Sequence, residues 1–221
     1  MLAGRGNKYA PSVVRVSSPE LLVLHGLRVK GMADAATVAE RFGLVRELVD
    51  ELLLDYEAYG WITHVVFADV AGWALTAAGR AENERRLAAE LDQTGTRSEV
   101  VAAHEVFLAL NSRFLNTITD WQIRPKPTDP LAAIDHTDPD WDQRALDDLH
   151  GLGRELQPVC ETLIVALPRF AGYPERYVAA LDRADRGERA WVAQPKIDSC
   201  HTVWMELHED LLATLGLERG A

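Results

Sequence analysis

The sequence predicts a mainly helical protein of the α+β class, in which one small β-hairpin interrupts a succession of helices. Two observations carry this prediction. In the first part of the chain, residues 1–96, three short helical patterns precede two runs rich in β-branched and aromatic residues. In the second part, residues 97–221, apolar residues recur every three or four positions along three long segments, which predicts a helical bundle.

The composition is typical of a globular protein. Apolar residues make up 48% of the 221 residues, enough to bury a sizeable core. No apolar run reaches the roughly 18–20 residues of a membrane span, and the N-terminus leads into no signal-peptide core, so we expect a cytoplasmic protein. The two cysteines, Cys160 and Cys200, form neither a disulfide framework nor a metal-binding knuckle.

The net charge of −11 is unevenly distributed. Residues 1–98 carry a net charge of −2, whereas residues 99–221 carry −9. Proteins that bind nucleic acids usually present a basic face, because the neutralised phosphates supply most of the affinity. Only the N-terminal part of the chain is therefore a candidate for DNA binding.

Capping residues delimit the first two helices. Ser18, which a proline follows, is expected to begin a helix that ends at Gly31. Asp34 is expected to cap a second helix over residues 35–42, and Gly43 follows it in the turn before the third helix.

A third helix, a hairpin and a fourth helix come next. The third helix is predicted from Leu44 to Tyr59, and Trp61 to Phe67 is predicted to be a strand. Trp73 to Leu75 is expected to pair back across residues 68–72, and Thr76 to cap a helix to about residue 92. The expected buried stripe of the third helix is Val45, Leu48, Val49, Leu52 and Tyr56.

This order of helices and strands is that of a winged helix-turn-helix, and residues 18–92 resemble the winged-helix regulators of the MarR and PadR type. The resemblance rests on the helix exit Gly60-Trp61-Ile62 and on the junction Trp73-Ala74-Leu75-Thr76-Ala77-Ala78-Gly79-Arg80. In such proteins, Leu-Thr-x-x-Gly-Arg after a hydrophobic residue closes the wing and begins the helix to the effector or dimer region. The resemblance implies a third helix in the DNA major groove, a homodimer and an effector-binding second part.

The charge of the third helix departs from that pattern. Between Leu44 and Tyr59 the only cation is Arg46, against five carboxylates, and the wing adds Asp69 without any cation. The candidate DNA contacts are therefore Arg46, Arg28, Lys30 and, in the N-terminal arm, Arg5, Lys8 and Arg15. The alternative is a winged helix that docks on a protein, or a small-molecule-binding module that does not bind DNA, since a fold does not fix a function.

The second part is expected to contain four helices joined by one long connection. The predicted helices run from Ser98 to Gln122, Trp141 to Leu167, Pro174 to Arg186 and Asp198 to Leu215. Pro158 is expected to kink the second of them. The proline-containing connection, residues 124–140, is too long to be a simple turn.

Polar residues on the apolar stripes form the candidate ligand site. His104 and Asn111 lie seven residues apart on one helix and His201 and His208 seven apart on another, about 10 Å along each axis. With their polar and aromatic neighbours, the candidate ligand-binding residues are His104, Asn111, Asp120, Trp121, Arg124, His201, Trp204 and His208. Three interpretations stay open: a core network that satisfies its own hydrogen bonds, a small-molecule pocket, and a metal site. The third is disfavoured, because the position four residues before His104 is Val100, and no cofactor is expected.

Signatures of catalysis are absent from the sequence. It contains no G-x-S-x-G elbow, phosphate loop or dinucleotide fingerprint, and the adjacent Cys200 and His201 point about 100° apart on a helix. We therefore expect a transcriptional regulator rather than an enzyme. Its predicted partners are double-stranded DNA, a small-molecule effector and a second copy of the chain.

Overall fold

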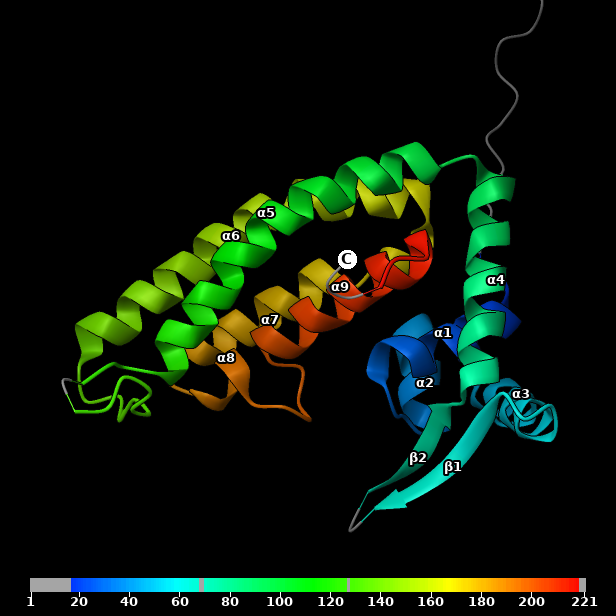
Figure 1. The fold of residues 1–221 in the computed structure, drawn as a ribbon, viewed down its shortest axis with the longest axis horizontal. Coiled ribbons are helices and arrows are strands. Elements are labelled where there is room, and N and C mark those ends of the chain that lie inside the picture. Colours follow the sequence, from blue (N-terminus) through cyan, green and yellow to red (C-terminus); the bar gives the residue numbers. More distant parts are fainter. Residues whose placement is uncertain (1–16, 68–69, 127, 219–221) are drawn as a thin grey trace, which may run out of the picture.

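The computed structural model describes residues 17–67, 70–126 and 128–218, so the cations Arg5, Lys8 and Arg15 lie outside the described residues. The chain is mainly helical, with one two-stranded antiparallel sheet (Figure 1). None of the helices in the described ranges combines the length and the apolar character needed to cross a membrane.

The first two helices begin and end where their capping residues predict. Helix α1 spans Pro19–Lys30 and α2 spans Ala35–Phe42. The Ser18 hydroxyl and the Asp34 carboxylate each accept a hydrogen bond from a backbone N–H of the first turn. Gly43 ends α2 in the left-handed conformation, with φ 64°.

The hairpin is longer than the sequence predicted. Helix α3 spans Arg46–Ala58, and the strands are β1, Ile62–Phe67, and β2, Val70–Leu75. The predicted second strand began three residues too late, because Ala71 and Gly72 have low β propensity but continue the ladder opposite β1. The backbone carbonyl of Ala33 packs so close to Gly72 that a side chain would be crowded there.

Helix α3 buries a stripe that differs from the predicted one. Val49, Leu53 and Tyr56 are buried, whereas Val45 is the residue before the helix and is exposed. Together with α1, α2 and β1 these side chains form the core of an N-terminal module, residues 17–95. The module ends with α4, Ala77–Thr94, whose first turn is capped by Thr76 as predicted.

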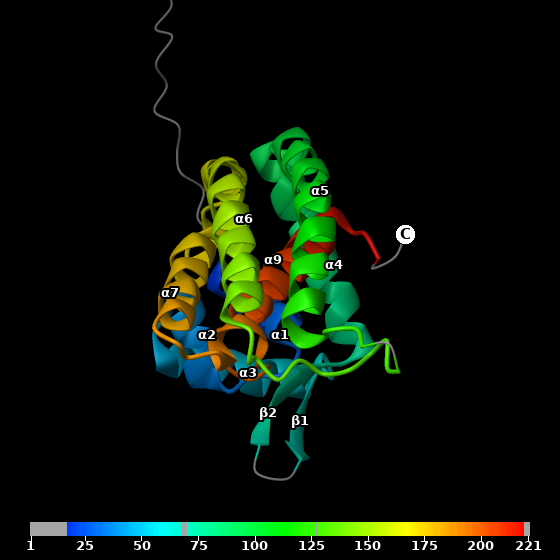
Figure 2. The same ribbon diagram turned by 90° about the vertical axis from the view of Figure 1, so that its left-hand side faces the viewer.

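The remaining helices form a bundle. They are α5, Arg97–Gln122; α6, Pro139–Ala166; α7, Tyr173–Asp185; and α9, Cys200–Leu215, with the short helices η1, Pro168–Phe170, and α8, Ala190–Ala193. The four long helices match the predicted ones to within about two residues, while η1 and α8 were not predicted. Both Figure 1 and Figure 2 show α5 beside α6, with α7 and α9 packed along them. Helix α6 continues through Pro158.

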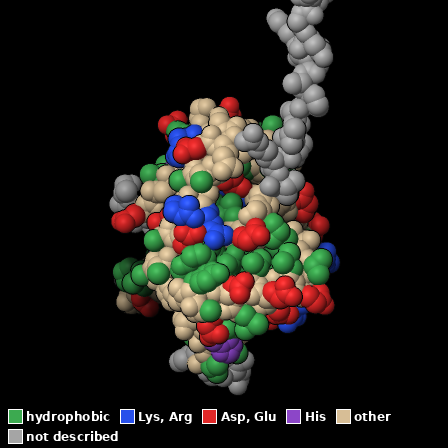
Figure 3. All heavy atoms as spheres, turned by 90° about the vertical axis from the view of Figure 1, so that its right-hand side faces the viewer, with side chains coloured by type: hydrophobic (Ala, Val, Ile, Leu, Met, Phe, Trp, Pro, Cys, Tyr) green, Lys and Arg blue, Asp and Glu red, His purple; other side chains and the backbone are tan. Residues whose placement is uncertain are grey.

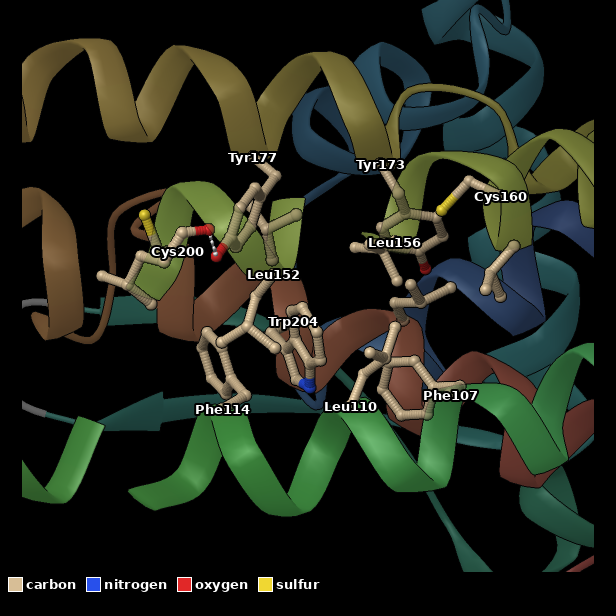
Figure 4. Packing of buried hydrophobic residues seen from close by; sticks show 14 of the residues in the cluster. Phe107, Leu110, Phe114, Leu152, Leu156, Cys160, Tyr173, Tyr177, Cys200 and Trp204 are labelled. Atoms are coloured by element: carbon tan, nitrogen blue, oxygen red, sulfur yellow. Dashed lines mark hydrogen bonds between the residues drawn. The ribbon is translucent and has the colours of Figure 1, made fainter. Parts of the chain in front are cut away.

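Aromatic side chains fill the centre of this bundle. Trp204 of α9 is fully buried and lies between Phe107 and Phe114 of α5 (Figure 4). The predicted stripe of α5, including His104 and Asn111, is buried as expected. The periodicity thus identified the core face of α5, whereas on α9 the stripe expected at His201, Trp204, His208, Leu211 and Leu215 is buried only at Trp204 and Leu211.

Helix α9 joins the bundle to the N-terminal module. It packs against α1 and α4 as well as against α5 and α7. Leu21, Leu87 and Ala213, from α1, α4 and α9, form a small hydrophobic cluster at this contact. The two parts of the chain thus share an interface.

Candidate functional site

The outer face of α3 is solvent-exposed and acidic. Arg46 is 55% exposed and its Nε lies 3.2 Å from the Asp50 carboxylate one turn along the helix. Leu54 and Tyr59 are 62% and 61% exposed between carboxylates. We call this face the α3 surface: Arg46, Glu47, Asp50, Glu51, Leu54, Asp55, Glu57 and Tyr59. Figure 3, which views this side of the molecule, shows hydrophobic and acidic side chains interspersed with few cations.

The predicted DNA contacts Arg28 and Lys30 face the interface between the two parts. Arg28 donates from Nε to Glu209 at 2.6 Å and from Nη1 to Glu84 at 3.1 Å, and its side chain is only 8% exposed. The Lys30 ammonium lies 2.8 Å from the Glu206 carboxylate. Their partners stand on α4 and α9, far away in the sequence, so the sequence could not indicate that these cations are already paired.

A buried ionic network, which the sequence did not predict, crosses the same interface. Asp210 of α9 accepts hydrogen bonds from Nη1 of Arg169 in η1 and from the hydroxyl of Tyr173 at 3.0 Å, and its Oδ1 lies 2.9 Å from Nε2 of His25 in α1. Arg169 also donates to Glu90 of α4 at 2.9 Å. We call these five residues the buried ionic network. It draws on five helices from both parts of the chain.

Opposing effects set the charge state of the network. Burial raises the pKa of the Asp210 carboxyl, but the neighbouring charges of His25 and Arg169 outweigh it and hold the pKa below its usual range. Burial, with a smaller effect of Asp210, raises the pKa of the Tyr173 hydroxyl well above its usual value. Asp210 is thus an anion and Tyr173 a neutral donor over the physiological range.

A cleft of about 710 Å³ opens beside the network, between α1 and α2 on one side and the η1–α7 segment on the other. Its charged lining residues are Lys30, Glu40, Arg41, Arg169, Arg176 and Asp198. We call it the interface cleft. Four of these six side chains are cations, in a protein whose net charge is strongly negative.

Four of the predicted ligand-binding residues pack against one another through phenylalanine rings. The indole Nε1 of Trp204 donates to Oδ1 of Asn111 at 3.0 Å. Phe114 stacks on Trp204 with ring centroids 4.2 Å apart, and the centroid of the His201 ring lies 6.2 Å from that of Phe114. The His208 ring likewise lies 5.4 Å from the ring of Phe107. Aromatic rings thus occupy the space where a ligand was expected, which favours a packed core over a small-molecule pocket.

Three further predicted ligand-binding residues lie at the other end of α5. Arg124 donates to Asp138 at 2.7 Å, and the main-chain carbonyl of Asp120 accepts a hydrogen bond from Trp141 at 2.8 Å. The Trp121 ring lies 4.7 Å from that of His136. The connection between α5 and α6 and the start of α6 are therefore packed against Asp120, Trp121 and Arg124. The eight predicted residues do not converge on one site.

His104 remains without a described hydrogen bond. Its Nε2 is buried and has no partner among the described residues, and burial lowers the pKa of the imidazole. Burial also lowers the pKa of His201. These histidines are therefore neutral core residues near neutral pH.

Both cysteines are buried and protonated near neutral pH. Burial raises the pKa of both Cys160 and Cys200 to about 12, so neither supplies a thiolate nucleophile near neutral pH. Within the part of the chain that the structure describes, no three His, Cys, Asp or Glu side chains are grouped to bind a metal ion.

Comparisons of the chain with models of known families, with curated proteins and with solved structures find no match. The features of the described residues that bear on its function are the α3 surface, the buried ionic network and the interface cleft.

Proposed function

We propose that the protein is a transcriptional regulator, in which α1 to α3 and the β1–β2 hairpin act as a winged helix-turn-helix on double-stranded DNA. The observation that carries the proposal is the exposure of α3. The tight turn at Gly43 joins α2 to α3. Among the described residues, the outer face of α3 is exposed to solvent. In helix-turn-helix proteins the second helix of the pair enters the major groove, and in the proposed α2–α3 pair this helix is α3.

The charge of the α3 surface sets the expected mode of binding. Arg46, together with the arm that carries Arg5, Lys8 and Arg15, would supply the phosphate contacts, because Arg28 and Lys30 are paired inside the protein. Carboxylates of α3 would repel phosphates but can accept hydrogen bonds from cytosine amino groups. We therefore expect weak non-specific affinity, with base contacts that depend strongly on the sequence of the duplex.

The proposed regulator acts in the cytoplasm as a homodimer that responds to a small molecule. Because α9 contacts α1 and α4, a ligand bound near that interface would change the position of α3 relative to its counterpart in the second copy. Affinity for paired half-sites would change accordingly.

Selection of DNA by the full-length chain tests this proposal. Tagged protein is incubated with fragments of the source genome at low salt, and the recovered duplexes are sequenced and then titrated in mobility-shift assays. We expect one shared, two-fold symmetric sequence to be enriched. No enrichment over a tag-only control, and no shift at micromolar protein, would refute the DNA-binding function.

A second candidate function is docking of α3 on a basic protein partner. The specific observation in its favour is the exposure of Leu54 and Tyr59 among the carboxylates of α3. Apolar side chains in a rim of charges are typical of protein interfaces. Such docking would persist at salt concentrations that abolish DNA binding through counterion release.

A further inference from the structure

We propose that the interface cleft binds a small oxyanion, a carboxylate or a phosphate, with Arg41 as its principal ligand. The proposal names the chemical class of the signal that the regulator would sense, and in that role it rests on the proposed function. Anion binding itself requires no DNA and is tested without it.

Arg41 is a half-buried cation of the cleft that lacks an ion pair among the described residues. Its guanidinium donates to two main-chain carbonyls, that of Ala171 at 2.9 Å and that of Arg169 at 3.4 Å, and its carbon lies 4.4 Å from the centroid of the Tyr173 ring. It forms no ion pair with any carboxylate of the described residues, and its buried Nε has no hydrogen-bond partner there. The chain has 34 acidic residues, yet none of those described forms an ion pair with this half-buried guanidinium. Partial burial of an unpaired charge costs free energy, which a bound anion would offset.

The other cations of the cleft are balanced by carboxylates. Lys30 and Arg176 share Asp198 and Glu206, and Arg169 is held within the buried ionic network. Glu40 is the remaining acid of the lining, and it is exposed at the helix surface next to Arg41. Arg41 is thus the arginine of the lining that has no ion pair among the described residues.

A second guanidinium with an unused donor lies near Arg41. Nη1 of Arg176 is buried without a hydrogen-bond partner among the described residues, although Nε and Nη2 bind carboxylates. The guanidinium carbons of Arg41 and Arg176 lie 4.4 and 5.8 Å from the centroid of the same Tyr173 ring. Both arginines line the cleft, and an oxyanion bound between them would accept hydrogen bonds from their guanidinium groups.

The remaining walls limit the size and the character of the ligand. Leu22, Phe42 and Pro168 give the cleft apolar surface beside the cations. A volume of about 710 Å³ accommodates a metabolite but no folded partner. A small molecule with one anionic group and a short apolar body fits both features, and a phosphate ester shares the same recognition chemistry.

Titration of the full-length protein with inorganic phosphate and with hexanoate tests the site, at ionic strength held constant with sodium chloride. Calorimetry and thermal unfolding should show saturable binding and a rising Tm with at least one anion. Binding of hexanoate alone identifies a carboxylate with an apolar body, and binding of phosphate alone identifies a phosphate ligand. No saturable response to either anion would overturn the proposal.

Matched variants assign the binding to Arg41. R41Q should weaken the affinity by at least about tenfold, the effect of losing a charge-assisted hydrogen-bond pair. R113Q removes a more exposed arginine of α5 that lies outside the cleft, and should bind like wild type. Wild-type affinity in R41Q would contradict the assignment.

A second variant, E40Q, tests the site even if R41Q fails to fold, because it is expected to bind the anion more tightly. E40Q removes the exposed carboxylate of the cleft and should tighten anion binding, so an unchanged or weaker affinity would also overturn the proposal. DNA binding without anion binding rejects this inference alone. Anion binding without DNA binding rejects only the regulator.

Discussion

Asp210 lies fully buried on α9 and contacts His25, Arg169 and Tyr173, each from a different element. Buried ion pairs repay the cost of desolvation only when both partners and their hydrogen bonds are present. Loss of one partner leaves the other charge uncompensated. Substitution of Asp210 should therefore strongly destabilise the protein.

Asp210→Asn should lower the free energy of unfolding by about 3–5 kcal/mol, because Arg169 would remain buried without its nearest counter-ion. The control, Asp50→Asn, removes an exposed carboxylate paired with Arg46 and should cost about 0.5 kcal/mol or less. Urea unfolding followed by circular dichroism measures both. A loss below about 1 kcal/mol in Asp210→Asn would show that the network contributes little.

His104 predicts how stability depends on pH. Burial lowers its pKa in the folded protein, so the unfolded chain binds the proton more tightly. Neutral His104 therefore costs the folded protein nothing above about pH 6.5, the usual pKa of histidine. Below that pH the unfolded chain takes up the proton first, so the free energy of unfolding decreases. The same sign holds for His201.

His104→Leu should consequently lose less stability between about pH 7.5 and pH 5.5 than wild type does. Leu110→Ala serves as the control, because it removes a buried side chain of the same helix that does not titrate. Its stability should be lower by a similar amount at both pH values. A pH dependence of His104→Leu identical to that of wild type would contradict the role given to this buried imidazole.

At the scale of elements, the junction between the hairpin and α4 is closely packed. Thr76 caps α4 and its hydroxyl also donates to the carbonyl of Gly60 at 2.7 Å. A Cβ added at Gly79 would lie 1.9 Å from the carbonyl oxygen of Trp61, which belongs to the backbone and cannot rotate away. Position 79 therefore requires a residue without a side chain.

Gly79→Ala should therefore destabilise the protein by at least about 2 kcal/mol, because the backbone must shift to relieve the clash. Gly151→Ala is the matched control, since Gly151 lies in the middle of α6 and its added Cβ would meet only the end of Arg154 at 3.9 Å. That variant should be neutral or stabilising by up to about 1 kcal/mol through helix propensity. Thermal unfolding compares the two, and equal Tm values would be inconsistent with the described junction.

Local signals allowed most elements to be predicted from the sequence. Ser18, Asp34 and Thr76 mark the helix starts because each side chain caps the backbone within its own turn. The stripe of α5 identified its core face, since burial on one side imposes a helical period. The predicted start of β2 was wrong, because Ala71 and Gly72 have little β propensity and depend on pairing with β1.

The candidate site was less predictable, because its contacts join residues far apart in the chain. Nothing near Asp210 indicates that its partners are His25 and Arg169, which stand on α1 and η1. Periodicity shows which face of a helix is buried but not which helix covers it. For the same reason Arg28 was a candidate DNA contact, whereas the structure pairs it with Glu209 of α9.

At the scale of the whole molecule, α9 connects the two parts of the chain. One side of it carries Trp204 into the bundle, and its C-terminal half contributes Asp210 and Ala213 to the contact with the N-terminal module. The interface cleft opens beside this contact. An anion bound there would act on the same surfaces that position α1 and α2, and thereby α3.

The central claim is that α3 and its hairpin form a DNA-binding surface whose phosphate contacts come from few cations. The salt dependence of the affinity for the selected duplex, measured by fluorescence anisotropy from about 50 to 200 mM salt, tests it most directly. We expect log K to fall linearly with log salt, by about 0.9 for each phosphate contact, and Arg46→Gln to reduce that slope by about one per protomer while Arg113→Gln does not. An affinity that is independent of salt, or a slope unchanged in Arg46→Gln, would contradict the account.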